Sequence, residues 1–305
     1  MPTDPLNGAS RGTPPDFLPK NPLKRAFFST YLKLTHSRMV SRLWDLSAYP
    51  SPNGRLDWME ITELALKLPG LPEAFDGYRI AHISDLHVGT WLKPHGLVQA
   101  VEQVNAQSPD LVAITGDFVT SHPEDHAPSI IEALKALTPR DGILAVLGNH
   151  DHWTDAGMIR EILTSIGAQD MSNRVVSLER KAQHLYIAGV DCSYLGFDQL
   201  DLVLNQLPAG EAAILLAHEP DYAVLSSATG RFGLQLSGHS HGGQVCFPRI
   251  GPLFLPRHGK LYPSGLYNIN GMQLYSNRGL GTAELQVRIN CPPEIAVINL
   301  ISSPG

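Results

Sequence analysis

Short apolar runs alternate with amphipathic segments along most of this chain. Apolar runs bounded by glycine, proline or charged residues predict buried strands. Segments with apolar residues at helical spacing predict helices at residues 97–107, 129–137 and 156–167. Strands are expected at residues 58–66, 78–84, 110–116, 142–148, 184–190, 212–218 and 232–238.

This alternation of strands and helices favours an α/β fold with parallel strand pairs. The chain closes with two further apolar runs, residues 272–277 and 294–300, which we expect to form hairpin-like pieces. We find no internal repeat in the sequence.

The first 55 residues follow a different pattern. Residues 1–23 are rich in proline, glycine, aspartate and serine, a composition that does not favour fixed structure. Residues 22–46 combine aromatic and aliphatic positions with lysine and arginine, as a basic amphipathic helix does. Such a helix packs on the main domain or on a second subunit, or lies on an anionic membrane surface. We therefore expect a partly disordered N-terminal extension over residues 1–55 and one domain over residues 56–305.

Composition excludes several classes of protein. The chain has 305 residues, 43% of them hydrophobic and 17% charged. This is a globular composition, with a charged fraction below the roughly 25% that is typical and therefore a somewhat uncharged surface. Its formal net charge of −6 argues against a nucleic-acid partner. Its three cysteines form no C-x-x-C pair, which indicates reduced thiols. No run approaches the roughly 20 apolar residues of a membrane span, and no secretory signal is seen. We expect a cytoplasmic protein, at most peripheral to a membrane, and the sequence leaves its oligomeric state open.

Five of the predicted strands end in side chains that can bind a metal ion. The carboxyl ends of strands in an open α/β sheet meet at one edge, so these side chains are expected to share a site. Carboxylate, imidazole and amide groups are ligands that divalent transition metals accept together. In chain order the candidates are Asp85, His87, Asp117, Asn149, His150, His218, His239 and His241.

The spacing of these candidates along the chain suggests which of them bind the same metal ion. Asp85 and His87 are two positions apart, and in an extended segment they would point to the same face and toward one ion. His239 and His241 lie in a glycine-rich turn, where they can diverge toward neighbouring ions. Each motif alone has a simpler interpretation as a turn, a helix cap or a hydrogen-bonded strand end. The ordered set favours a metal site.

The same motifs carry a resemblance to a known family. The series D-L-H, G-D, G-N-H-D, H and G-H-S-H-G-G resembles the calcineurin-like metallophosphoesterases. The segments "SDLHVG", "LSGHSHGGQ" and "SNRGLG" are similar to its bacterial YkuE/YaeI-type phosphodiesterase branch. The resemblance covers about residues 56–305. It implies a four-layer α/β/β/α sandwich, in which two mixed sheets are flanked by helices and carry a dinuclear metal site.

The resemblance also implies roles for individual residues. Asp117 would bridge the two ions, which we expect to be Mn, Fe or Zn. A hydroxide between the ions would attack the phosphorus in line. His150 would protonate the departing alkoxide or stabilise the developing charge, and Asp151 is a candidate to orient it. The first ion would be held by Asp85, His87, Asp117 and His241, and the second by Asp117, Asn149, His218 and His239.

The substrate is less well specified. Arg278, in "YSNRGLG", can contact a phosphate oxygen or simply brace its loop. The text "GDFVTSHPEDH" disfavours the protein Ser/Thr phosphatases, which carry GDxVDRG. Residues 246–268 are apolar, proline-rich and basic, which suits a lipid-linked or nucleotide-diphosphate substrate at a membrane. A small-molecule phosphodiester or pyrophosphate is therefore the expected substrate.

Other functions stay open. The same site could serve a phosphomonoesterase of broad specificity, or a non-catalytic metal-binding scaffold with this fold. A nuclease is disfavoured by the acidic balance. An amidohydrolase-like zinc enzyme would leave Asp117 and Asn149 without roles.

Overall fold

The structure is a computed structural model that describes residues 48–49, 56, 58–89, 91–283 and 285–302. The chain divides between Leu46 and Ser47, and every described residue belongs to the unit Ser47–Gly305. The predicted N-terminal helix at residues 22–46 and the proposed disorder at residues 1–23 lie outside the described residues. The domain boundary near residue 55 stays a prediction.

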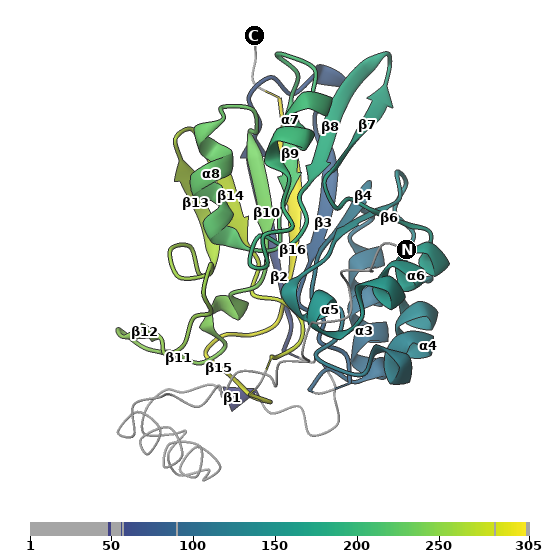
Figure 1. Cartoon of the computed structure of the whole chain (residues 1–305), viewed down its shortest axis with the longest axis vertical. Helices are drawn as coiled ribbons and strands as arrows, with labels where there is room; N and C mark the ends of the chain where they lie inside the picture. Colours follow the sequence, from purple (N-terminus) through teal and green to yellow (C-terminus); the bar gives the residue numbers. More distant parts are fainter. Residues whose placement is uncertain (1–47, 50–55, 57, 90, 284, 303–305) are drawn as a thin grey trace, which may run out of the picture. The chain divides into compact units, whose positions relative to one another are not determined.

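The first sheet has six strands, in the order β2-β16-β3-β4-β5-β6 (Figure 1). Neighbouring strands run parallel except for β16 and β3, which are antiparallel. Its strands are β2 (Glu60–Lys67), β3 (Arg79–Ile83), β4 (Leu111–Thr115), β5 (Ile143–Val146), β6 (Ala168–Asp170) and β16 (Glu294–Ile301).

The second sheet also has six strands, in the order β13-β14-β10-β9-β8-β7. The two outermost pairs are antiparallel and the inner pairs are parallel. Its strands are β7 (Arg174–Arg180), β8 (Gln183–Gly189), β9 (Ala213–Leu216), β10 (Leu234–Ser237), β13 (Gly265–Ile269) and β14 (Met272–Ser276).

Helices cover the outer face of each sheet, so the unit has four layers (Figure 1). Alternation along β4 shows the packing: Val112 and Ile114 face the helices, whereas Leu111 and Ala113 face the second sheet. The α/β/β/α sandwich expected from the sequence is confirmed. The helices are α3 (Pro94–Ala106), α4 (Pro123–Leu134) and α6 (Ala156–Ile166) on the first sheet, and α7 (Leu200–Gln206) and α8 (Ala223–Ala228) on the second.

Short elements complete the unit. The hairpin β11–β12 extends away from the two sheets (Figure 1). Within the described residues no helix is both long and apolar enough to span a membrane. The short elements are β1 (Ala48–Tyr49), η1 (Glu73–Phe75), α5 (Asn149–Thr154), η2 (Pro220–Tyr222), η3 (His241–Gly243), β11 (Cys246–Phe247), β12 (Gly251–Pro252) and β15 (Arg288–Ile289).

Each strand and helix predicted between residues 58 and 238 has a counterpart in the structure, but one late prediction is wrong. The run at residues 294–300 is not a hairpin piece, because β16 lies inside the first sheet between β2 and β3. It is buried over most of its length, as a continuous apolar run allows. The run at residues 272–277 does form a hairpin, with β13, and β14 also pairs with β10.

Candidate metal centre

The candidate ligands follow five strands that belong to both sheets. The loops after β3, β4 and β5 of the first sheet supply five of them, and the loops after β9 and β10 of the second sheet supply three. All eight side chains belong to residues that are at most 8% exposed. Buried carboxylates and imidazoles need partners, and so dense a polar cluster in a core is costly unless a charge holds it together. The eight residues are Asp85, His87, Asp117, Asn149, His150, His218, His239 and His241.

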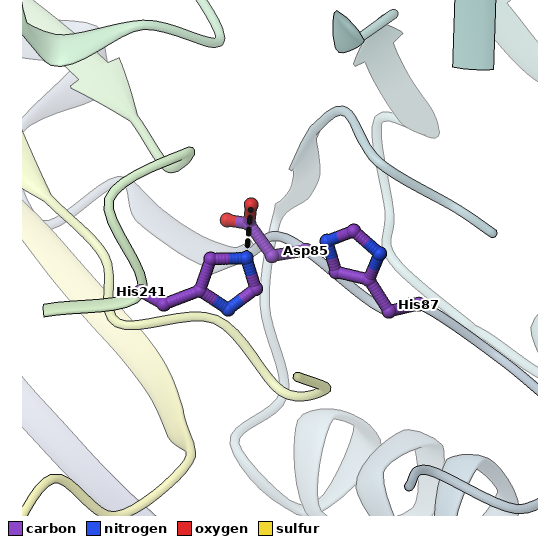
Figure 2. A group of neighbouring side chains, drawn as sticks. All are labelled: Asp85, His87 and His241. Atoms are coloured by element: carbon purple, nitrogen blue, oxygen red, sulfur yellow. Dashed lines mark ion pairs between the residues drawn. The ribbon is translucent and has the colours of Figure 1, made fainter. Parts of the chain in front are cut away.

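One group consists of Asp85, His87 and His241, whose ligand atoms lie within 4.8 Å of one another. Figure 2 shows the three side chains converging from two loops. Nε2 of His241 is 3.4 Å from Oδ1 of Asp85. The group therefore joins a loop of the first sheet to a loop of the second.

A second group consists of Asp117, His218 and His239, again with ligand atoms within 4.8 Å of one another. Nε2 of His218 is 3.2 Å from Oδ2 of Asp117 and 3.2 Å from Nδ1 of His239. His239 and His241 thus belong to different groups, and the expectation that they diverge agrees with this geometry.

Asp117 connects the two groups. Its Oδ2 is 3.2 Å from Nε2 of His218 and 3.5 Å from Nε2 of His87. Its Oδ1 accepts a hydrogen bond of 2.9 Å from the backbone N–H of His150. One carboxylate oxygen therefore faces imidazoles from both groups.

The backbone brings these residues together in a way that the sequence argument missed. Asp85 and His87 have φ angles of 48° and 44°, so the segment is not extended, and that premise is wrong. Asp117, His239 and His241 also have positive φ, between 52° and 65°. Each such conformation costs a non-glycine residue about 1 kcal/mol or more, and strain of this kind gathers at functional sites.

Two glycines allow the backbone to approach the ligands closely. A Cβ at Gly148 would overlap Oδ1 of Asp117, and one at Gly238 would overlap Oγ of Ser84 and Oδ2 of Asp85. The turns after β5 and β10 therefore form walls of the site. Any residue larger than glycine at Gly148 or Gly238 would displace the neighbouring side chains.

Hydrogen bonds to the far ring nitrogens fix the orientation of three histidines. Nδ1 of His218 donates to the carbonyl of Thr115 at 2.6 Å, which leaves Nε2 free to face the cluster. Nε2 of His239 donates to the carbonyl of Arg257 at 2.8 Å, which leaves Nδ1 facing His218. Nδ1 of His87 pairs with Oγ1 of Thr120 at 2.8 Å. Metal-binding histidines are commonly oriented in this way.

Asp151 does not orient His150, contrary to the sequence-based suggestion. Its carboxylate accepts hydrogen bonds of 2.8–2.9 Å from the backbone N–H groups of Asp117, Phe118 and Gly148. It therefore ties the loop after β4 to the start of α5. The His150 ring instead packs edge-on against His87, with ring centroids 4.8 Å apart.

The two carboxyl groups of the site, those of Asp85 and Asp117, have pKa values shifted in opposite directions. Burial alone would raise the pKa of Asp117, but the neighbouring imidazoles of His218 and His150 hold it well below its usual range. Burial would lower the pKa of His218, but the charge of Asp117 raises it well above its usual range. Burial raises the pKa of Asp85 to about 7. Asp117 is thus an anion paired with a protonated His218.

Three imidazoles of the site, those of His87, His239 and His241, are neutral. Burial lowers the pKa of His87 and of His239 to about 4, and that of His241 falls well below its usual value for the same reason. Neutral imidazole is the form that binds metal ions.

The residues fit a pair of metal ions. Oδ1 of Asn149 is buried and has no hydrogen-bond partner among the described residues. A buried amide oxygen left unpaired costs about 1–3 kcal/mol, and a cation would satisfy it. The ligand separations of 3.2–3.5 Å match those of two ligands on one ion, each about 2.0–2.2 Å from it.

Arg278 is held by two carboxylates. Its Nη2 lies 2.7 Å from Oε2 of Glu60 and 3.1 Å from Oε1 of Glu294, and its Nε donates to Glu294 at 3.2 Å. These bonds agree with the loop-bracing alternative, and the proposed phosphate contact stays a prediction.

Sequence analysis missed Glu219, which directly follows His218. Its carboxylate is fully buried and accepts hydrogen bonds from Cys192, Ser193 and Tyr194. The signal was an acidic residue at the end of an apolar strand, next to a candidate ligand.

A four-layer sandwich with buried aspartate and histidine groups where its two sheets meet defines a metal-dependent hydrolase of the metallophosphoesterase class. Comparison with known families agrees, because residues 78–243 match the model of the calcineurin-like phosphoesterases. The chain belongs to this family.

Two relatives support the assignment by their sequences. The chain is 34% identical over 249 residues to the uncharacterised metallophosphoesterase YkuE of Bacillus subtilis, an alignment that covers 80% of this chain and 86% of that one. It is 27% identical to the phosphodiesterase YaeI of Escherichia coli, covering 73% and 82% of the two chains. Among solved structures, the sulfate thiohydrolase SoxB of Thermus thermophilus is similar with a TM-score of 0.45 and 13% identity, over 76% of this chain and 57% of that one.

Proposed function

We propose that this metallophosphoesterase is a phosphodiesterase that works with two divalent ions. The observation that carries the proposal is the position of Asp117, whose Oδ2 faces His87 on one side and His218 on the other. A carboxylate shared by two groups of potential metal ligands is suited to bridge two cations. The similarity to a relative named as the phosphodiesterase YaeI supports the choice of diesters.

The ligands follow from the two groups. Mn, Fe and Zn all accept this mixture of imidazole, carboxylate and amide, and we propose one of them as the native metal. One ion would be held by Asp85, His87, Asp117 and His241, and the other by Asp117, Asn149, His218 and His239.

When bound, the two ions would neutralise the phosphoryl oxygens and lower the pKa of a water molecule for in-line attack. Asn149 contributes an oxygen without charge, which leaves the site more positive than a third carboxylate would. His150 lies against the ring of His87, at the edge of the first group. We assign to it the protonation of the leaving alkoxide, which is worth about 10²–10⁴ in rate.

The substrate that we propose is membrane-associated or a nucleotide diphosphate. Support comes from residues 246–268, where Ile250 and Leu261 are 76% and 59% exposed and Arg249 and Lys260 are exposed beside them. The carbonyl of Arg257, in the same segment, accepts the hydrogen bond from His239. An apolar and basic segment is thus connected directly to a proposed ligand, and a peripheral membrane contact would bring a lipid-linked substrate to the site.

A phosphomonoesterase is the second candidate, because the same residues could act on a terminal phosphate. A non-catalytic scaffold is less well supported, because the described residues keep the whole donor set that hydrolysis would need.

The test compares hydrolysis of bis(4-nitrophenyl) phosphate with that of 4-nitrophenyl phosphate by protein loaded with Mn²⁺, Fe²⁺ or Zn²⁺, together with metal analysis. We expect about two ions per chain and a higher kcat/KM for the diester. Asp117→Ala should lose both the metal stoichiometry and turnover. His150→Ala should keep both ions and lose most of the turnover, about 10²-fold or more for a diester with an alkoxide leaving group and least for the 4-nitrophenyl esters, whose leaving group needs little protonation.

Preference for the monoester would favour the second candidate. Full activity of Asp117→Ala would contradict the bridging role, and unchanged kcat of His150→Ala on a diester with an alkoxide leaving group would remove the proposed acid.

A further inference from the structure

Two aromatic side chains, one against the proposed acid His150 and one against the proposed ligand His239, are not used by the mechanism above. The Trp153 ring is 4.8 Å from the His150 ring, centroid to centroid, and meets it at 67°. The Tyr194 ring is 5.9 Å from that of His239 and 5.6 Å from that of Trp153. We call Trp153 and Tyr194 the aromatic rim. It borders both groups, through His150 on one side and His239 on the other.

The rim is not part of the core. Trp153 is 42% exposed, although it sits in the six-residue helix α5, which begins with the buried Asn149. Tyr194 is partly exposed. Burying an indole stabilises a fold by several kcal/mol, so a tryptophan left open to solvent beside a buried polar centre retains a face that a ligand can cover.

Glu219 holds Tyr194 in place. Its Oε1 accepts hydrogen bonds of 3.0 Å from the thiol of Cys192 and from the backbone N–H of Tyr194. Its Oε2 accepts from the backbone N–H and the hydroxyl of Ser193, at 3.1 and 2.9 Å. All four donors come from three consecutive residues. The carboxylate next to His218 therefore positions the loop that carries the rim.

The same two segments also border a cleft of about 360 Å³. Phe197 lines it and is 47% exposed, with its ring 4.8 Å from that of His152. Asp191 accepts a hydrogen bond of 2.7 Å from His152 across the cleft wall. Helix α5 and the loop after β8 thus provide both an aromatic face at the proposed ligands and an open space with a further aromatic wall. The cleft is lined by His152, Asn173, Asp191, Gly196, Phe197 and Gln199.

We propose that the aromatic rim binds a flat ring on the substituent of the phosphoester that does not leave. This inference rests on the proposed phosphodiesterase function and names its substrate class: diesters that carry an aromatic or heteroaromatic ring. A ring stacked on Trp153 would lie one side chain away from His150 and so beside the reacting phosphate. Stacking of a base on an aromatic side chain is worth about 1–3 kcal/mol, which corresponds to about 5- to 150-fold in affinity.

The first test uses two diesters with the same leaving group, bis(4-nitrophenyl) phosphate and methyl 4-nitrophenyl phosphate. For each variant, kcat/KM for bis(4-nitrophenyl) phosphate is divided by kcat/KM for methyl 4-nitrophenyl phosphate. Differences in metal loading between variants cancel in this ratio because they affect both substrates alike. Trp153→Ala should lower the ratio at least about fivefold, and Trp153→Phe should keep most of it because a flat face remains. Leu202→Ala, an exposed residue of α7, should leave the ratio unchanged. A ratio in Trp153→Ala equal to that of the wild type would overturn the proposal.

The positioning role of Glu219 has its own readout. Tyr194→Ala and Glu219→Gln should lower the ratio alike, and the double variant should lower it no further, because Glu219 acts through the loop of Tyr194. Additive losses would mean that Glu219 acts elsewhere.

A binding measurement separates this proposal from the function on which it rests. Phenylphosphonate and methylphosphonate are titrated calorimetrically into the Mn²⁺-loaded protein. The wild type should bind phenylphosphonate about tenfold more tightly than methylphosphonate, and Trp153→Ala should bind the two ligands equally. If the wild type hydrolyses no diester, the proposed function fails, but the two dissociation constants still test whether the aromatic rim binds a ring. Equal dissociation constants for the two phosphonates in the wild type would refute the proposal.

Discussion

At the scale of single residues, several proposed ligands are oriented by a hydrogen bond to the atom that does not face the cluster. His218 and His239 both give one ring nitrogen to a backbone carbonyl, and this decides which nitrogen faces the cluster. Asp117 has one oxygen on the His150 N–H and the other between two imidazoles. The donors are thus oriented before any ion binds, which reduces the entropy lost on binding.

The protonation of these residues predicts how metal affinity depends on pH. The pKa of Asp85 is raised to about 7, and that of His218 lies well above its usual value, so both groups carry protons at slightly acid pH. Metal ligands must be deprotonated, so binding displaces these protons. Apparent affinity should therefore rise with pH, by about tenfold per unit for each proton displaced.

Calorimetric titration with Mn²⁺ at pH 6 and pH 8, each in two buffers of different ionisation enthalpy, measures this release. His122→Ala, a change at an exposed histidine, should leave it unaltered. Equal affinity at both pH values, with no dependence on the buffer, would contradict the assignment of these protons.

At the scale of elements, the site depends on tight turns at the carboxyl ends of the strands. The turn after β10 begins with Gly238, whose N–H donates to the carbonyl of His218 at 2.9 Å. The next residue, His239, donates its backbone N–H to Asp85, at 3.1 and 3.0 Å from its two carboxylate oxygens. The turns therefore hold one another, and a change in one displaces a ligand supplied by another.

Gly238→Ala tests this dependence. A methyl group there overlaps Ser84 and Asp85, so we expect a loss of about 1–3 kcal/mol in the free energy of unfolding and weaker metal binding. Chemical denaturation and metal titration measure the two effects.

Gly157→Ala is the matched control. This glycine lies in α6, where the nearest atom to an added Cβ is the Asp155 carboxylate at 3.1 Å, and alanine favours helix. Stability should be kept or raised. A Gly238→Ala protein as stable and as tightly metal-binding as the wild type would show that the turn tolerates displacement.

At the scale of the whole molecule, the site exists only because two sheets pack face to face. Asp85, Asp117 and Asn149 come from the first sheet, whereas His218, His239 and His241 come from the second. The apolar cluster between the sheets, which includes Ile80, Leu216 and Leu236, sets their separation.

We predict that residues 1–46 contribute to membrane binding and not to hydrolysis. Every proposed ligand lies in Ser47–Gly305, so deletion of residues 1–46 should leave hydrolysis of a soluble diester unchanged. The lysines and arginines of residues 22–46 are each worth about 1 kcal/mol near an anionic surface, so the deletion should weaken binding to phosphatidylglycerol-containing vesicles at least about tenfold.

Sedimentation with vesicles of phosphatidylcholine alone controls for charge, and the variant Arg249→Gln tests the separate contribution of the 246–268 segment. Vesicle binding unchanged by the deletion would remove the N-terminal segment from the membrane proposal.

The sequence alone determined the type and order of the strands, the residues that follow them and the kind of chemistry that those residues can perform. These properties are local: an apolar run needs burial whatever covers it, and carboxylates, imidazoles and an amide at strand ends are donors wherever they meet. For the same reason the run at residues 294–300 was recognised as a strand, but its place between β2 and β3 was not.

Tertiary structure alone decided which donors share a group, which ring nitrogen faces them and how the loops bend. Asp85 and His87 meet through left-handed turns rather than an extended strand, because hydrogen bonds from their N–H groups to Gly116 and Asp117 hold that conformation. The contact between the Glu219 carboxylate and the backbone of Tyr194 exists only because β9 lies beside β8. Contacts between residues far apart in the chain depend on how two sheets pack, and no local pattern carries that information.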